Sequence, residues 1–93
     1  MTTPQQIRVA RFVDARGHRC PTPTLRLRRA LEGVGAGDTV ELVADDPMAK
    51  IDVPHFAAGA GHELSATTTE GSVLRFWVRK RAVDAADAAH PQA

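Results

Sequence analysis

The sequence has few of the residues on which several common chemistries depend. Its 93 residues include one cysteine, Cys20, with three phenylalanines, one tryptophan and four histidines. A lone cysteine cannot close an internal disulfide, and without a Cys-x-x-Cys pair it does not predict a thioredoxin-like oxidoreductase. The histidines show no close pairing such as His-x-x-x-His, so we expect no metal site and no cofactor.

Net charge and hydropathy argue against two further classes of protein, namely nucleic-acid-binding proteins and membrane proteins. The formal net charge of +1 gives no support for direct nucleic-acid binding, which is usually accompanied by a strongly basic domain or stripe. The chain has no apolar run of transmembrane length and no N-terminal signal pattern, so we expect no membrane partner. A free thiol normally survives in a reducing compartment, and we therefore predict a cytoplasmic protein.

The composition is typical of one small folded domain. Apolar residues make up 43% of the chain and charged residues 25%, which is ordinary for a globular protein. A chain of this length holds a single hydrophobic core. We expect one domain over residues 1–80, followed by a flexible or frayed helical tail over residues 81–93 that is rich in alanine.

Hydrophobic periodicity predicts the order of the elements. An apolar, β-prone segment over residues 7–13 is followed by a helix whose buried face repeats at i, i+3, i+4 and i+7, namely Leu27, Ala30, Leu31 and Val34. Further strands are predicted over residues 39–44, 62–69 and 72–80, the last two forming a hairpin across Glu70-Gly71.

The second helix is harder to place, because Pro47 and Pro54 cannot both lie in its first turn. We expect Asp52 to cap a helix that begins near Val53 and ends at Gly61, after a turn at Asp46-Pro47. The predicted fold class is α/β: a two-layer sandwich with the order β-α-β-α-β-β, in which two helices cover one face of a small, mixed, four-stranded sheet.

Cys20 is the main candidate for chemistry, because it stands where the first helix begins. Pro21 and Pro23 fit a first helical turn and would disrupt a helix interior, so Cys20 is predicted to be the N-cap. The helix dipole there favours the thiolate, and Arg16, Arg19, Arg26 and His18 would lower the thiol pKa further if they converged on it. The alternative is a buried structural cysteine.

The residues around Cys20 resemble the signature of a known family. The segment Asp-Ala-Arg-Gly-His-Arg-Cys-Pro-Thr-Pro over residues 14–23 is similar to that of the TusA/SirA family of small sulfur carriers. Later segments also match, and the whole resemblance covers residues 9–80. The resemblance implies that Cys20 is the catalytic residue and that the motif supports its thiolate; the supporting positions are Asp14, Gly17, Arg19, Pro21, Thr22 and Pro23. Thr22 departs from the acidic residue that many members carry between the two prolines.

The predicted function is therefore that of a sulfurtransferase-type carrier. Cys20 would accept sulfane sulfur as a persulfide and pass it to an acceptor protein, and no second cysteine is present to discharge it. The resemblance implies a donor of the cysteine desulfurase or rhodanese type, and an acceptor in tRNA thiolation, molybdenum-cofactor assembly or sulfur metabolism. Candidates for docking acidic partner surfaces are Arg16, Arg26 and Arg29, together with Arg19 and Arg28.

An alternative function comes from the last strand. Trp77 alternates with Arg75 and Arg79, so these three residues are predicted to lie on the face of the sheet that the helices leave open. Such a face could serve a non-catalytic interaction or nucleic-acid-binding module, with Cys20 incidental. The simpler interpretation is that Trp77 packs against the neighbouring strands.

The sequence allows two interpretations of Asp45 and Asp46. They are either an acidic pair or, with Pro47, the cap of the next helical turn.

Overall fold

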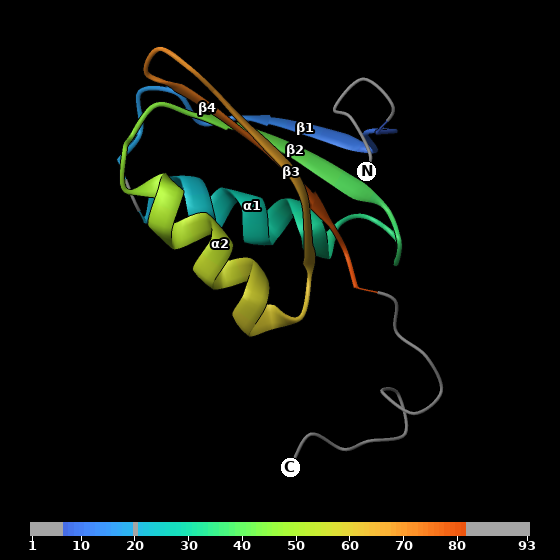
Figure 1. Ribbon diagram of the computed structural model, residues 1–93. Coiled ribbons are helices and arrows are strands. Elements are labelled where there is room, and N and C mark those ends of the chain that lie inside the picture. Colours follow the sequence, from blue (N-terminus) through green and yellow to red (C-terminus); the bar gives the residue numbers. More distant parts are fainter. Residues whose placement is uncertain (1–6, 20, 82–93) are drawn as a thin grey trace.

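The computed structural model describes residues 7–19 and 21–81, and its elements follow the predicted order (Figure 1). The first three are β1 (Arg11–Asp14), α1 (Thr22–Glu32) and β2 (Thr39–Ala44). They are followed by α2 (Ala49–Ala60), β3 (Glu63–Glu70) and β4 (Val73–Arg79). The fold class is thus confirmed.

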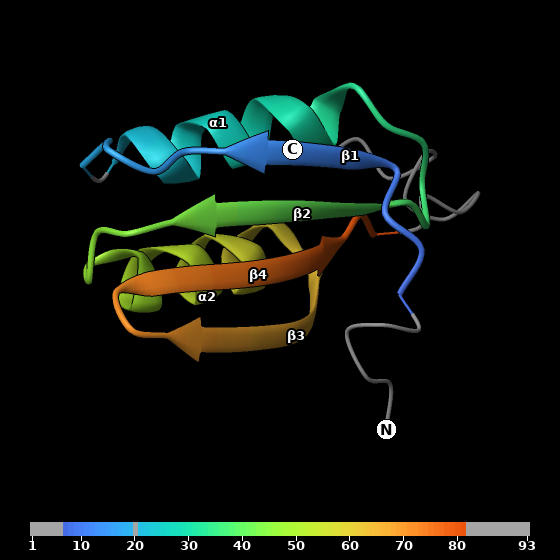
Figure 2. The same ribbon diagram turned by 90° about the horizontal axis from the view of Figure 1, so that it is seen from above.

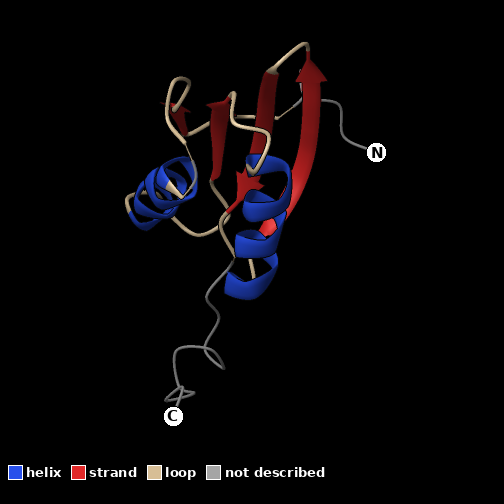
Figure 3. Ribbon diagram, turned by 90° about the vertical axis from the view of Figure 1, so that its left-hand side faces the viewer, coloured by secondary structure: helices blue, strands red, loops and turns tan. Residues whose placement is uncertain are grey.

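The four strands form one mixed sheet in the order β1-β2-β4-β3. β1 is parallel to β2, whereas β4 is antiparallel to both β2 and β3. Both helices lie on the same face of this sheet, so the molecule has two layers (Figures 1 and 3). The parallel β1-β2 pair brings two loops together, because the segments that follow the two strands emerge at the same edge of the sheet.

Alternating side chains of β2 and β4 form the centre of the core. Val40, Leu42 and Ala44 of β2 point toward the helices, as do their neighbours on β4, and all are buried. The predicted face of α1 packs against them, with Leu27, Ala30 and Leu31 buried and Val34 partly buried. The spacing of apolar and polar residues therefore predicted correctly which side chains of β2, β4 and α1 face the core.

Trp77 lies on the opposite face of the sheet, and it is only 6% exposed. Its cross-strand neighbours are Glu41 on β2 and Ala66 on β3, where a bulge shifts the register. The flanking arginines form ion pairs, from Arg75 to Glu41 at 2.9 Å and from Arg79 to Glu63 at 3.4 Å. This geometry favours the packing role of Trp77 over a stacking platform, because a base cannot stack on a covered ring.

The start of α1 differs from the prediction by one residue. The N-cap is Pro21, with φ −90° and ψ 8°, rather than Cys20. The N–H of Thr22 donates to the carbonyl oxygen of Arg19 at 2.9 Å, which makes a tight turn before the first helical residue. The double-proline segment still starts the helix, because Pro23 occupies a first-turn position that has no hydrogen bond to lose.

The predicted start of α2 near Val53 is wrong, because the helix begins at Ala49 and contains Pro54. The Asp46-Pro47 turn leads directly into it: the N–H of Met48 donates to Asp46 Oδ1, and the N–H of Ala49 donates to the Asp46 carbonyl oxygen. Asp52 therefore lies in the first turn and is not the cap. The burial of Ala49, Val53 and Ala57 at intervals of four residues offsets the bond that Pro54 cannot make.

One prediction concerns the C-terminal end of the chain. Apart from Arg81, the predicted tail lies outside the described residues. Within residues 7–19 and 21–81, neither helix is long and apolar enough to cross a bilayer.

Candidate functional site

The loop after β1 and the loop after β2 are joined by hydrogen bonds. The N–H of Gly17 donates to Oδ1 of Asp45 at 3.0 Å, and the N–H of Ala15 donates to the carbonyl oxygen of Val43 at 2.7 Å. Both loops leave the sheet at the ends of the parallel strands β1 and β2, which lie side by side in Figure 2. The segment that leads to Cys20 is thus attached to β2 and the loop after it as well as to its own strand.

Asp14 folds the beginning of this loop. Its carboxylate accepts hydrogen bonds from Arg16 Nε at 2.9 Å, Arg16 Nη2 at 2.8 Å and the Arg16 backbone N–H at 3.1 Å. The Asp14 carbonyl oxygen accepts a further bond from Arg26 Nη1 at 2.8 Å, which ties the loop to α1. The side-chain hydrogen bonds from Arg16 lower the pKa of Asp14 to about 2. The same contact raises the pKa of Arg16.

Glycine is required at position 17 by the backbone conformation and not by the closeness of neighbouring atoms. Its φ is +84°, in the left-handed region, and a Cβ built on it would meet no atom within 4 Å. A residue with a side chain would therefore be strained by its φ alone. The Asp and Gly of the predicted motif thus have structural roles, since both shape the loop.

A hollow of about 520 Å³ lies between the two loops. It is lined by Gly17, His18, Arg19, Asp45, Asp46, Pro47 and Met48. His18 and Arg19 come from the loop before Cys20, whereas the carboxylates of Asp45 and Asp46 come from the loop after β2. The hollow is therefore a cleft at the sheet edge with the His18 imidazole and the Arg19 guanidinium on one side and carboxylates on the other.

The segment around position 20 is held on both sides, although Cys20 itself lies outside the described residues. The bond from Thr22 to the Arg19 carbonyl oxygen spans this position, and the N–H of Leu25 donates to the Pro21 carbonyl oxygen at 2.9 Å. Arg19 and Pro21 are both exposed, whereas Pro23 is buried against the core. The prolines therefore have different tasks: Pro21 caps the helix and Pro23 anchors it.

The predicted basic site residues lie in three places. His18 and Arg19 line the hollow, whereas Arg16 and Arg26 bind Asp14 and so organise the loop. Arg29 lies elsewhere on α1 and lines a separate groove together with Arg26.

Asp46 caps the turn before α2, as one of the two open interpretations predicts. Asp45 has a role that the sequence analysis missed, namely to accept the Gly17 N–H. The signal was present, because loops that follow adjacent parallel strands meet at one edge. Within the described part of the chain, no three His, Asp or Glu side chains are grouped to hold a metal ion.

The fold and this loop define a class: small two-layer α/β proteins in which a Cys-Pro-x-Pro segment begins the first helix at the edge of the sheet. The family model described as sulfurtransferase TusA matches residues 11–80, and the chain belongs to this family. The chain is 36% identical over 70 residues to "Putative sulfur carrier protein YrkI" of Bacillus subtilis (strain 168), covering 75% of this chain and 93% of that protein.

A solved structure supports the same assignment. The SirA-like protein of Desulfitobacterium hafniense superposes with a TM-score of 0.68 at 25% sequence identity, covering 76% of this chain and 97% of that one. The predicted resemblance to the TusA/SirA family is therefore confirmed.

Proposed function

We propose that this member of the TusA family carries sulfane sulfur as a persulfide on Cys20 and relays it between partner proteins in the cytoplasm. The observation that supports the proposal best is the double attachment of the loop before Cys20, by Arg26 to the Asp14 carbonyl oxygen and by the Gly17 N–H to Asp45. A carrier must present its cysteine to two different proteins in turn. A short, fixed and exposed segment at the edge of a sheet suits this task better than a deep pocket does.

The chemistry needs no reagent other than the partners. The Cys20 thiolate attacks the terminal sulfur of a donor persulfide, a new S–S bond forms at Cys20, and the donor S–S bond breaks. The electron pair of the broken bond leaves with the donor cysteine as a thiolate. In the second step an acceptor thiolate attacks the terminal sulfur of the Cys20 persulfide, and Cys20 becomes a thiolate again.

The surroundings of position 20 favour the thiolate. His18 and Arg19 precede the cysteine and line the hollow, and α1 begins immediately after it. A helix N-terminus and neighbouring cations both stabilise a negative sulfur. Arg16 contributes less positive charge than the sequence suggests, because its guanidinium is paired with Asp14.

The donor and acceptor are proteins in this proposal. By analogy with the family, the donor is a cysteine desulfurase or a rhodanese-type enzyme, and the acceptor belongs to tRNA thiolation, molybdenum-cofactor assembly or sulfur metabolism. Arg26 and Arg29 remain candidates for docking acidic partner surfaces, since both are exposed on α1.

Intact-protein mass spectrometry tests the loading step. The purified chain is incubated with a small-molecule persulfide donor and measured before and after a thiol reductant is added. The expected result is a gain of about 32 Da, one sulfur atom, that the reductant removes and that Cys20→Ser does not show. An equal gain in Cys20→Ser, or no gain in the wild-type chain, would contradict the proposal.

A further inference from the structure

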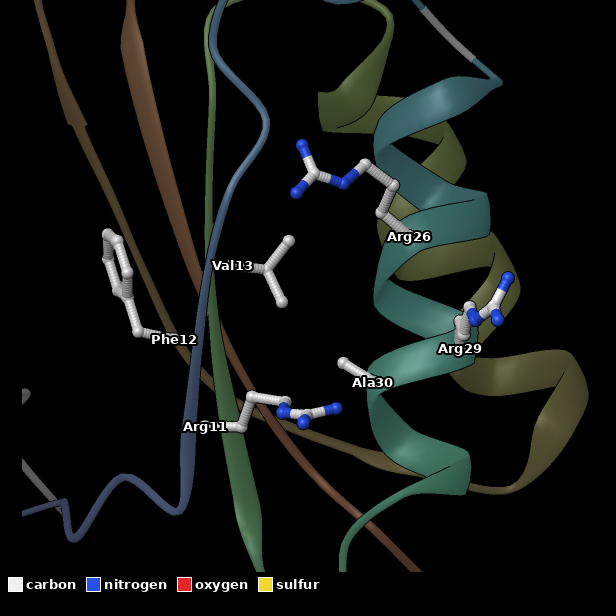
Figure 4. Close-up of a pocket in the computed structure, with 6 residues that line it drawn as sticks. All are labelled: Arg11, Phe12, Val13, Arg26, Arg29 and Ala30. Atoms are coloured by element: carbon white, nitrogen blue, oxygen red, sulfur yellow. The ribbon is translucent and has the colours of Figure 1, made fainter.

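A second groove lies between the free edge of β1 and α1. It measures about 270 Å³ and is lined by Arg11, Phe12, Val13, Arg26, Arg29 and Ala30. In Figure 4, Arg11 and Arg26 reach into the space between strand and helix from opposite sides, and Arg29 lies further out on α1. We call this the arginine groove.

The arginine groove has no carboxylate among its lining residues. The acidic side chains of β1 and α1 are engaged elsewhere: Asp14 pairs with Arg16 at 2.8 Å, and Glu32 pairs with Arg28 at 3.8 Å. Arg26 donates to the Asp14 backbone carbonyl oxygen, and its positive charge also helps to lower the pKa of the Asp14 carboxyl group. The groove therefore presents three guanidinium groups, none of which forms a salt bridge with a described acidic side chain of β1 or α1.

The strand beside the groove has an open edge. β1 is the outermost strand, paired only with β2 among the described strands. The N–H of Ala15 donates to the Val43 carbonyl oxygen, so by alternation the backbone groups of Phe12 and Asp14 point away from the sheet. Of these groups, the Asp14 carbonyl oxygen accepts the hydrogen bond from Arg26. Figure 2 shows α1 extending past this edge, one layer below it. An added strand would lie beside β1 and above the arginines of α1.

We propose that the arginine groove binds an acidic, extended segment of a partner protein, which adds a strand to β1 and sets its carboxylates against Arg11, Arg26 and Arg29. The proposal rests on the relay described above for the identity of the partner, but the binding itself does not depend on sulfur transfer. Main-chain hydrogen bonds to the edge provide affinity in this mode, and the arginines select the charge.

The dimensions of the groove fit such a segment. Nη1 of Arg11 lies 3.2 Å from where a Cβ of Gly33 would be, so Arg11 lies at the far end of α1 from Arg26. Seven residues of helix separate Arg26 from Gly33, an axial distance of about 10 Å. A strand covers this distance in about three residues, with acidic side chains at alternate positions about 7 Å apart. A nucleic acid would match the charge but not the hydrogen-bonding edge, so the peptide is favoured.

Binding of a synthetic peptide tests the proposal. The probe is an eight-residue, capped peptide of alternating glutamate and valine, titrated into the full chain and followed by calorimetry. The expected effect of Arg29→Ala or Arg11→Ala is a Kd about 3 to 10 times higher. Arg28→Ala is the matched control, since Arg28 lies next to Arg29 on the same helix but outside the groove, and it should leave the Kd unchanged.

Two further peptides test the strand pairing. Each is N-methylated on one of the two alternating sets of residues, which removes the N–H groups along one edge only. One peptide should lose binding and the other should keep it. Loading of Cys20 by a small-molecule persulfide, measured on the same variants, should not change, so failure of this proposal is distinct from failure of the carrier function.

Several results would overturn the inference. They are the absence of peptide binding, equal binding of a peptide with glutamine in place of glutamate, equal effects of Arg28→Ala and Arg29→Ala, or unchanged binding of both methylated peptides. Binding of a uridine oligonucleotide through Arg11 and Arg29, without peptide binding, would replace the acidic segment with a nucleic acid.

Discussion

The backbone N–H of Gly17 donates to the carboxylate of Asp45, 28 residues further along the chain, at 3.0 Å. This bond joins the loop that leads to Cys20 to the loop that leads to α2. Asp45 is therefore predicted to fix the position of the sulfur carrier segment without taking part in the chemistry.

Replacing Asp45 tests this role. Asp45→Ala removes the acceptor and is expected to slow sulfur loading of Cys20 about tenfold or less, because the loop loses one attachment but keeps the Asp14 contacts. Asp45→Asn retains an oxygen acceptor and should recover most of the rate. Loading is followed by quenched mass spectrometry, with melting temperature as a check on the fold. Equal rates for wild type and Asp45→Ala would remove Asp45 from the site.

Gly17→Ala is expected to destabilise the protein. The φ of +84° costs a residue with a Cβ about 1 kcal/mol, which lowers the melting temperature by about 4–8 °C in a domain of this size. Gly59→Ala is the control, because Gly59 is helical with open space around it, and alanine there should leave stability equal or higher. A higher melting temperature for Gly17→Ala would show that the loop does not need this conformation.

Much of the fold could be predicted from the sequence, whereas the start of α2 could not. Alternating and helical periodicity predicted the layers, the mixed sheet and the buried faces, because burial of apolar side chains decides them. The start of α2 was misplaced, because Pro54 indicates a helix start locally, whereas packing of Ala49 and Val53 on the sheet begins the helix earlier.

At the site, the sequence identified the motif but not its contacts. Asp14 and Gly17 were selected by resemblance, and the structure supplies their physical reasons: a carboxylate that receives three hydrogen bonds and a left-handed backbone. Arg16 was expected to face a thiol or a partner, but its local pairing with Asp14 is a contact that spacing alone did not predict.

Acidification should weaken the loop through Asp14. The pKa of Asp14 in the folded protein is about 2, below its ordinary value of 3.8, because the ionised carboxylate accepts hydrogen bonds from Arg16. Its contribution to stability is therefore complete above about pH 3.8 and is lost as the pH falls toward 2. Urea midpoints measured between these limits should fall more steeply for wild type than for Asp14→Asn. Parallel curves for the two proteins would contradict the assignment.

Trp77 is predicted to be a structural residue. It is 6% exposed, so Trp77→Ala should cost about 3 kcal/mol in unfolding free energy, whereas the milder Trp77→Phe should cost less and remain folded. Urea denaturation measures both variants. If Trp77→Phe kept its stability while abolishing binding to a partner or an oligonucleotide, the sheet face around Trp77 would be an interaction site, as the alternative function requires.

Delivery of a labelled sulfur atom tests the central claim most directly. Wild-type protein is loaded from a donor whose terminal sulfur carries an isotope label, freed of the donor, and mixed with a protein thiol acceptor, beside Cys20→Ser treated in the same way. The account predicts that one labelled sulfur atom per chain leaves Cys20 and appears on the acceptor as a persulfide. Label that never attaches to Cys20, or that is released as sulfide without reaching the acceptor, would contradict it.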